Sequence, residues 1–197
     1  GMSWQRGMRL LMLLLAIGGG LVVTSSCEEH AVPRPRGYPR IDFPKKEYRP
    51  TADSLPFFFE MPAYMELLHS AREGYAYNMS APRYRATIHL TYYNRPSALN
   101  TLMEDSRKMA YQHSVRADAI RESLYEDSAR RVYALLYRLS GDVASAVQFY
   151  ATDSVSHFLR GALYFYVAPN ADSLAPAVAF FDADMVHLLE TLRWKFF

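Results

Sequence analysis

The clearest pattern of hydrophobic and polar positions runs from Arg83 to Tyr93. Within it, alternate residues are apolar: Ala86, Ile88, Leu90 and Tyr92. The residues between them are polar: Arg85, Thr87, His89 and Thr91. Because successive side chains of a strand point to opposite faces of a sheet, this alternation predicts a strand with one buried face.

Shorter apolar runs precede this strand. Apolar residues on one side of 38–43 predict an edge strand, where the neighbouring prolines are tolerated. A buried strand is expected over 55–61, and another short strand over 75–79. Residues 64–71 lack such a pattern and predict a helical turn or an irregular loop.

Two segments have the three- and four-residue spacing of an amphipathic helix. The first is expected over 97–114, after Pro96, which suits a first helical turn. The second is expected over 172–194, where Asn170 or Asp172 can cap the first free amides. Charged residues lie mostly away from each apolar stripe, so we expect both helices to lie on a sheet.

Further apolar segments between the two helices predict strands. Residues 115–125 are compatible with strand or helix, and strand is preferred because strands follow. Strands are then expected over 132–139, 144–152 and 157–167, joined by short turns as in an antiparallel meander. This order predicts an α+β fold: a largely antiparallel sheet with two long helices packed on it, a layered sandwich. The order of elements resembles that of PsbP/Mog1-like sandwiches.

The N-terminal segment is an apolar run from Leu10 that ends in small residues and Cys27, the single cysteine of the sequence. Arg6 and Arg9 precede the run. Basic residues, an apolar core of about a dozen residues and small residues are typical of a secretion signal peptide. An uncleaved membrane anchor is the alternative, but it needs roughly 20 apolar residues, and glycines 18–20 interrupt the run.

Residues 24–27, TSSC, resemble a bacterial lipobox, whose usual pattern is an aliphatic residue, two small residues and cysteine. Thr24 departs from the aliphatic preference. The resemblance implies that the Cys27 thiol carries a diacylglyceryl group, built from fatty acids such as palmitate. Two or more acyl chains anchor a protein stably to a membrane. Glu28 and Glu29 follow, as in some surface-exported lipoproteins of Bacteroidetes.

The sequence therefore predicts three parts. Residues 1–27 are a lipoprotein signal peptide, residues 28–37 an extended tether, and residues 38–197 a single α+β domain. Prolines in the tether favour extended, polyproline-like backbone. Four cations in and after the tether, Arg34, Arg36, Arg40 and Lys45, lie either near anionic headgroups or in solvent, and the solvated linker is preferred.

Charge and cysteine content exclude several classes. The sequence has 22 Lys and Arg against 20 Asp and Glu, and removing Arg6 and Arg9 leaves 22 − 2 = 20 against 20. A neutral domain gives no electrostatic basis for binding nucleic acid. One cysteine excludes an internal disulfide and a cysteine-rich zinc site.

The only group that invites a hydrolase interpretation is Asp153, Ser156 and His157. Adjacent Ser and His side chains point to opposite faces of a strand, so they form no local dyad. The G-x-S-x-G nucleophile motif does not occur in the sequence. An envelope hydrolase would require these groups to converge in space.

Other candidate groups also favour ordinary structural roles. His89 and His113 could meet as metal ligands, but two partly exposed imidazoles are preferred. Asp182 and Asp184 lie two residues apart on a predicted helix and do not face one another, which favours a solvated face. We therefore expect no catalytic residue, no cofactor and no metal site.

Tyrosines are frequent in the predicted strands: Tyr92, Tyr93, Tyr133, Tyr137, Tyr150, Tyr164 and Tyr166. They either pack beneath helices or form a docking surface, because tyrosine is enriched at interfaces. The core is preferred, and a face left open by the helices would be the exception.

Four blocks carry a family resemblance: PRPRGYPRIDFP at 33–44, YQHSVRADAI at 111–120, FYATDSVSHFLRGALYFYVAPNADS at 149–173 and ETLRWK at 190–195. Together with the signal ending at Cys27, they resemble the gliding-motility lipoprotein GldD family of Bacteroidetes. The resemblance implies an envelope lipoprotein linked to gliding and to type IX secretion. It transfers no catalytic residue, only lipid attachment at Cys27.

The expected function is therefore that of a lipid-anchored, non-catalytic protein, on the periplasmic side or the cell surface, that supports the assembly or stability of this machinery. Expected partners are the membrane and other gliding or secretion lipoproteins or envelope proteins. The alternative is a lipid-anchored module that binds a small hydrophobic ligand in a tyrosine-lined cleft.

Overall fold

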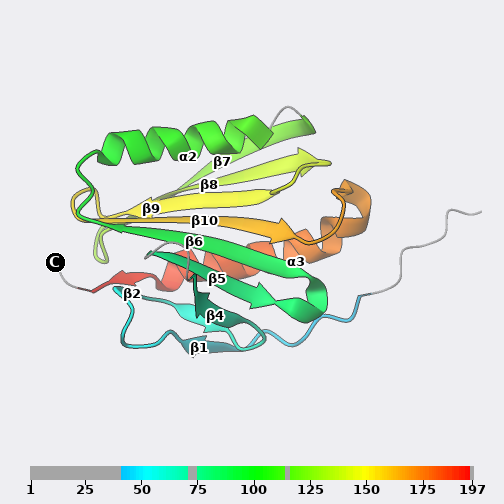
Figure 1. Cartoon of the computed structure of the whole chain (residues 1–197), viewed down its shortest axis with the longest axis horizontal. Helices are drawn as coiled ribbons and strands as arrows, with labels where there is room; N and C mark the ends of the chain where they lie inside the picture. The colour runs from blue at the N-terminus through cyan, green and yellow to red at the C-terminus, as the bar shows by residue number, and fades with distance from the viewer. Residues whose placement is uncertain (1–40, 71–74, 114–115, 196–197) are drawn as a thin grey trace, which may run out of the picture. The chain divides into compact units, whose positions relative to one another are not determined.

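The structure is a computed structural model of the chain, and it describes residues 41–70, 75–113 and 116–195. Its centre is a seven-stranded antiparallel sheet with the strand order β4-β5-β6-β10-β9-β8-β7 (Figure 1). In chain order these strands are β4 Glu66–His69, β5 Ala76–Ala81, β6 Ala86–Asn94, β7 Ala117–Asp127, β8 Val132–Gly141, β9 Val147–Thr152 and β10 His157–Phe165. The α+β prediction, with its largely antiparallel sheet, is confirmed.

Short strands from both ends of the described chain form two small sheets beside the large one. One pairs β1 Tyr48–Pro50 with β3 Glu60–Pro62. The other pairs β2 Phe57–Phe58 with β11 Arg193–Trp194, so the chain end returns to the entry segment. We call residues 41–65, which contain β1 to β3, the entry arm. A 3-10 turn, η1 Pro82–Tyr84, joins β5 to β6.

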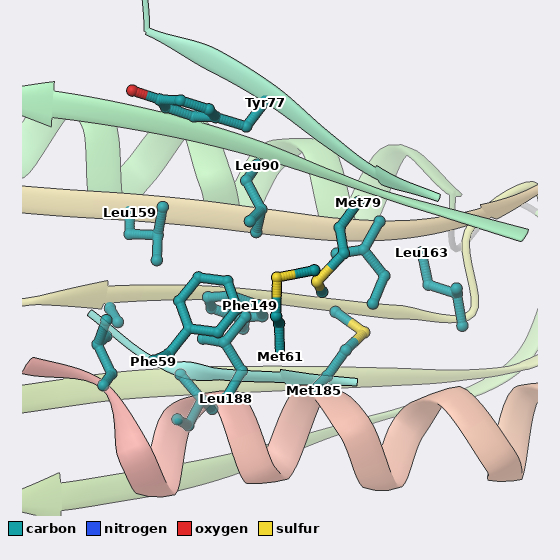
Figure 2. Close-up of a cluster of buried hydrophobic side chains, with 14 of the residues drawn as sticks. Phe59, Met61, Tyr77, Met79, Leu90, Phe149, Leu159, Leu163, Met185 and Leu188 are labelled. Carbon is teal, nitrogen blue, oxygen red and sulfur yellow. The ribbon is translucent and has the colours of Figure 1, made fainter. Parts of the chain in front are cut away.

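Helix α3 Ala171–Thr191 covers one face of the large sheet. Phe181, Met185 and Leu188 of α3 are buried against alternate residues of the strands, including Leu90 of β6 and Phe149 of β9 (Figure 2). Residues of the entry arm complete the same cluster: Phe57, Phe59, Met61 and Met65. The core is thus a layer between the sheet, α3 and the entry arm.

Helix α2 Leu99–His113 lies on the opposite face. Ala110 of α2 is buried in a second cluster with Tyr137 and Leu139 of β8, whereas Ala134 and Leu136 of the same strand belong to the α3 cluster. Because alternate residues of a strand point to opposite faces, the two helices pack on opposite sides of the sheet. The prediction of two long helices packed on a sheet is confirmed, and the structure adds that the sheet lies between them.

Both ends of α3 are fixed by specific hydrogen bonds. At the start, the Asn170 side chain accepts a bond from the Ser173 N–H at 3.0 Å, as the capping prediction requires. At the end, Arg130 donates from Nη1 to the carbonyl oxygens of Leu189 at 3.2 Å and Leu192 at 2.7 Å. A cation at the last free carbonyls satisfies them and complements the helix dipole.

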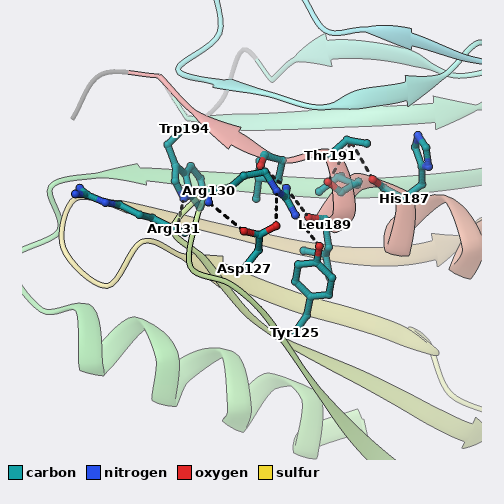
Figure 3. A network of polar contacts seen from close by, with 10 residues as sticks. Tyr125, Asp127, Arg130, Arg131, His187, Leu189, Thr191 and Trp194 are labelled. Atoms are coloured by element: carbon teal, nitrogen blue, oxygen red, sulfur yellow. Dashed lines mark hydrogen bonds and ion pairs between the residues drawn. The ribbon is translucent and has the colours of Figure 1, made fainter.

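Arg130 is itself held in place by two neighbours (Figure 3). Its Nε lies 2.9 Å from the Asp127 carboxylate, and its Nη2 donates to the Tyr125 hydroxyl at 2.6 Å. The indole N–H of Trp194 donates to the carbonyl oxygen of Arg131 at 2.9 Å. The β7–β8 turn therefore anchors both the end of α3 and the strand that follows it.

Most element predictions are confirmed, apart from one to three residues at their ends. The strands over 75–79, 83–93, 115–125, 132–139 and 157–167 are present, as is the helix over 97–114. The strand expected over 144–152 begins only at Val147, and the helix expected to reach residue 194 ends at Thr191, where β11 replaces its last turn.

Three predictions in the N-terminal half are wrong. Residues 41–43 form no strand, and Phe43 instead stacks on Phe180 of α3, with ring centroids 4.4 Å apart; residues 38–40 lie outside the described part. The single strand over 55–61 is two strands in different sheets. The expected turn or loop over 64–71 contains β4, which pairs with β5.

Gly161 of β10 lies opposite Phe149 of β9 on the α3 face. A Cβ atom at position 161 would lie 2.3 Å from Cε1 of the buried Phe149 ring. The glycine therefore leaves the space that the ring fills, and this close approach explains a glycine in the middle of a central strand.

We predict that Gly161→Ala lowers the free energy of unfolding by about 1–3 kcal/mol, because the added methyl group overpacks the core. Urea denaturation followed by circular dichroism measures the change. In a Phe149→Leu background the same substitution should cost less, since the smaller side chain frees the space. A stabilising Gly161→Ala would contradict this account, because alanine is otherwise the better residue within a strand.

Candidate functional site

The Asp153, Ser156 and His157 group lies at the turn between β9 and β10. One Asp153 oxygen accepts three backbone N–H bonds of this turn at 2.7–3.0 Å. The His157 Nδ1 atom lies 2.6 Å from the Tyr92 hydroxyl, and its ring stacks on Trp194 with centroids 5.0 Å apart. Asp153 thus holds the turn while the imidazole packs in the interior, and these contacts do not have the arrangement of a Ser-His-Asp triad.

The pKa of Asp153 is consistent with a structural role for its carboxylate in this turn. Burial acts to raise the pKa of Asp153, but the backbone N–H groups stabilise its anion, so its pKa lies below the usual value. Asp153 therefore remains charged at neutral pH.

The two aspartates of α3 have different surroundings. Asp182 forms a two-bond ion pair with Arg138 of β8, at 2.6 Å to Nε and 2.9 Å to Nη2. Asp184 is 0% exposed. The prediction that both belong to a solvated face is wrong for Asp184, which faces the entry arm.

Three side chains of the entry arm bind the Asp184 carboxylate. Lys46 Nζ and the Tyr48 hydroxyl each lie 2.8 Å from Oδ1, and the Tyr64 hydroxyl donates to Oδ2. Lys46 also donates to the carbonyl oxygen of Phe180 at 2.7 Å and lies 3.3 Å from the centre of its ring. A buried carboxylate is stable only when it is paired and hydrogen-bonded, and the entry arm supplies all of these donors. We call Lys46, Tyr48, Tyr64 and Asp184 the Asp184 cluster.

The pKa shifts show what this cluster can do chemically. Burial, followed by hydrogen bonding to Asp184, raises the pKa of Tyr48 and Tyr64 above the usual tyrosine range. Burial lowers the pKa of Lys46, while the bond to Asp184 acts in the opposite direction. Both phenols therefore stay protonated and serve as donors to the carboxylate rather than as bases.

One neighbouring pair extends the cluster towards the surface. The Tyr48 ring stacks on His187 of α3, with centroids 3.7 Å apart, and His187 Nε2 lies 2.7 Å from the Glu60 carboxylate. The entry arm is therefore bound to α3 through two successive turns of the helix.

His89 and His113 are the two histidines considered as metal ligands, and the described residues show no metal site at either. His89 Nδ1 lies 2.5 Å from the Asn78 side-chain oxygen, and burial lowers the pKa of His89. The side chain of His113 lies outside the described part. Within residues 41–70, 75–113 and 116–195, no three His, Cys, Asp or Glu side chains form a group that could hold a metal ion.

The tyrosines divide between core and surface. Tyr92 and Tyr137 are buried, as the preferred interpretation predicts, and Tyr133, Tyr150 and Tyr164 are half-buried. Tyr93 and Tyr166 are exposed, so the core interpretation is wrong for these two.

A cavity of about 580 Å³ lies between α3 and the β7–β8 side of the sheet. Its lining includes the Arg138–Asp182 ion pair, Arg121 and Asp118, together with small apolar residues such as Val178. No tyrosine lines this cavity. Charged and apolar residues therefore share its lining, and this cavity is not a tyrosine-lined cleft.

The family comparison covers this whole architecture. A model of the family described as gliding motility lipoprotein GldD matches residues 28–194. The chain belongs to this family. It is accordingly a gliding-motility lipoprotein, a membrane-anchored protein of the cell envelope. A search of curated proteins gave no match.

The structure brings two of the sequence blocks that resemble the GldD family side by side. His157 comes from the block at 149–173 and Trp194 from the block at 190–195, and their rings stack. Cys27, the predicted lipid-attachment residue, lies outside the described residues and directly before the first matched residue, Glu28. No helix in the described part of this GldD-family chain is long and apolar enough to cross a membrane.

The sequence pattern singles out none of the donors around Asp184. Lys46, Tyr48 and Tyr64 lie 138, 136 and 120 residues away from it along the chain. One signal was present: Asp184 follows Phe181 by three residues and precedes Leu188 by four, so it occupies a position on the apolar stripe of α3. A charged residue at a core position requires a buried partner.

We predict that Asp184→Asn lowers the free energy of unfolding by about 3 kcal/mol, because Lys46 loses its charge partner and two phenols lose an anionic acceptor. The matched control is Asp182→Asn, two residues away, which should cost about 1 kcal/mol because its ion pair is partly exposed. Equal costs for the two variants, measured by urea denaturation, would show that the Asp184 cluster is not a special constraint.

A second prediction concerns alkaline pH. Burial, followed by the nearby Asp153 charge, raises the pKa of Tyr92 to about 12. The unfolded chain, with a tyrosine pKa of about 10, binds fewer protons than the folded chain between pH 10 and 12. The contribution of Tyr92 to the free energy of unfolding is therefore complete below pH 10 and is lost as the pH rises to 12. Tyr92→Phe should make the fall in unfolding free energy across this window shallower, by about 1.4 kcal/mol per pH unit. An unchanged slope in Tyr92→Phe, measured by urea denaturation at several pH values, would contradict this account.

Proposed function

We propose that this GldD-family chain is anchored to the membrane by a lipid on Cys27 and acts without catalysis to support the assembly or stability of the gliding and type IX secretion machinery. The observation that carries the proposal is the family match over residues 28–194, which begins one residue after the predicted lipid site. The partners proposed are the membrane and other envelope proteins of the same machinery.

The side-chain chemistry of the described residues supports a non-catalytic role. Buried and half-buried polar side chains hold elements together. The Asp184 cluster joins the entry arm to α3, and Arg130 binds the last carbonyl oxygens of that helix. Asp153 holds a turn, and the His157 ring is packed in the interior. A nucleophile with an adjacent base is the usual sign of covalent catalysis, and these groups do not have that geometry.

The length of chain between the predicted lipid site and the entry arm limits how far the domain can lie from the membrane. Ile41 is the first described residue, and Lys46 already contacts α3. From residue 27 to residue 41 the chain spans at most about 50 Å when fully extended. The domain would therefore work within a few nanometres of the membrane that holds the lipid.

The test compares wild-type protein with Cys27→Ala in the native envelope. Metabolic labelling with a palmitate analogue should label the wild type and not the variant, which should also leave the membrane fraction. Ser26→Ala is the matched control, because alanine keeps the small residue that the lipobox requires. A Cys27→Ala protein that remains labelled and pellets with membranes would refute lipid attachment at Cys27.

The same strains test the partner proposal. Crosslinking of wild-type cells, followed by affinity capture in mild detergent, should recover other gliding or secretion envelope proteins, and Cys27→Ala should lose them. Recovery of none from the wild type would count against a role in this machinery.

A further inference from the structure

The outer edge of the large sheet at β7 is long and unpaired within the described residues. β7 spans 11 residues, Ala117–Asp127, and among the described strands it pairs only with β8. A bulge between Ala117 and Ala119 interrupts its start, so residues 120–127 form the regular part. The opposite edge, β4, has only four residues. Figure 1 shows β7 at the margin of the sheet beyond β8.

The backbone of β7 is available on its outer side. In the described part, its residues make no backbone hydrogen bond outside the ladder with β8. Every second N–H and C=O of an edge strand points away from the sheet, so residues 120–127 present a row of free donors and acceptors. Such an edge is a template for an added strand.

The side chains beside this edge have an unusual composition. Leu124 is 77% exposed, although it is a large apolar residue in the middle of a strand. Glu122 and Glu126 flank it at two-residue spacing and therefore lie on the same face of β7. Glu122 accepts a bond from Tyr111 at 2.8 Å, and Glu126 forms no ion pair with the other described residues. The face thus presents one apolar contact between two carboxylates.

Charge decides which occupant this edge fits. β7 carries the four acidic residues Asp118, Glu122, Glu126 and Asp127 against one cation, Arg121, a balance of 1 − 4 = −3. If a second copy paired antiparallel with this edge, with the two Leu124 residues opposite each other, Glu122 of one copy would lie opposite Glu126 of the other. Like charges opposite each other destabilise a strand pair. A strand with cations at two-residue spacing would instead pair with both carboxylates.

We propose that the edge of β7 over residues 120–127 is a docking site for an extended segment of a partner protein, which adds to the sheet as an eighth strand. The recognised segment carries an apolar residue opposite Leu124, flanked at two-residue spacing by Lys or Arg. Backbone bonds supply affinity, and the Glu122, Leu124 and Glu126 side chains supply specificity. The inference deepens the proposed function, on which it rests, by naming the surface through which a partner would bind.

The probe is a synthetic blocked peptide with the central sequence Lys-Thr-Val-Thr-Lys, and its control has Glu in place of both Lys. Both are added to the detergent-solubilised full chain, and hydrogen exchange is measured. The basic peptide should slow the exchange of amides within 120–127 and leave β4 unchanged. Protection elsewhere, or equal binding of the acidic peptide, would overturn the proposal.

Substitutions at the edge test the same contact. Leu124→Lys and Glu126→Lys should each weaken binding of the basic peptide by at least about tenfold. Val155→Lys is the matched control, since Val155 is 73% exposed in the turn between β9 and β10, and it should bind like the wild type. Thermal melts confirm that each variant is folded.

The remaining outcomes are also decisive. If the edge variants bind like the wild type, β7 is not the site. A concentration-dependent dimer of the wild type that Leu124→Lys abolishes would assign the edge to a second copy and overturn the proposal. Because the peptide measurement does not involve Cys27, it can fail while lipid labelling succeeds, and the reverse is equally visible.

Discussion

The fold depends on one buried charge. Asp184 is fully enclosed on α3, and an unpaired carboxylate in that position would be strongly destabilising. Its donors come from Lys46, Tyr48 and Tyr64, near the start of the described chain. The entry arm therefore stabilises the helix in its observed position. The arm depends on the helix in return, because strands of two or three residues are not stable alone. The first and last described segments of the chain are thus stabilised together.

This mutual dependence explains which parts of the fold could be predicted from sequence. β6 and the two helices have periodic patterns that one segment displays by itself, and their predictions are confirmed. The entry arm has no such local signal. Residues 55–61 are predicted to form a single buried strand, yet Phe57 pairs with Trp194 and Met61 pairs with Arg49. The break between β2 and β3 is set by pairing partners 137 and 12 residues away, and the first of these lies outside any local window.

The site residues differ in the same way: those with local contacts can be predicted from sequence, and those with distant partners cannot. Asn170 as a helix cap follows from local chemistry, and its bond is present. His157 looks reactive beside a serine, but its surroundings are set by Tyr92 and Trp194, which arrive from other strands. Asp184 is predicted to lie on a solvated face because it and Asp182, two residues apart on a helix, do not face one another, although its position on the apolar stripe of α3 indicates burial. The prediction of lipid attachment at Cys27 rests on a linear sequence motif, and Cys27 lies outside the described residues.

The arrangement of the sheet also relates the two proposals. The entry arm lies on the side of β4 and β5, and β7 forms the opposite margin (Figure 1). Seven strands have six spacings, so these two edges are separated by about 29 Å across the sheet. If lipid on Cys27 holds the chain, the membrane tether reaches the domain at the arm, where the Asp184 cluster fixes it to α3. An added strand at β7 would then bind at the far edge, where it displaces none of the contacts that join the arm to the helix. The sheet between these edges would separate a bound partner from the arm, and such a role requires no catalytic group.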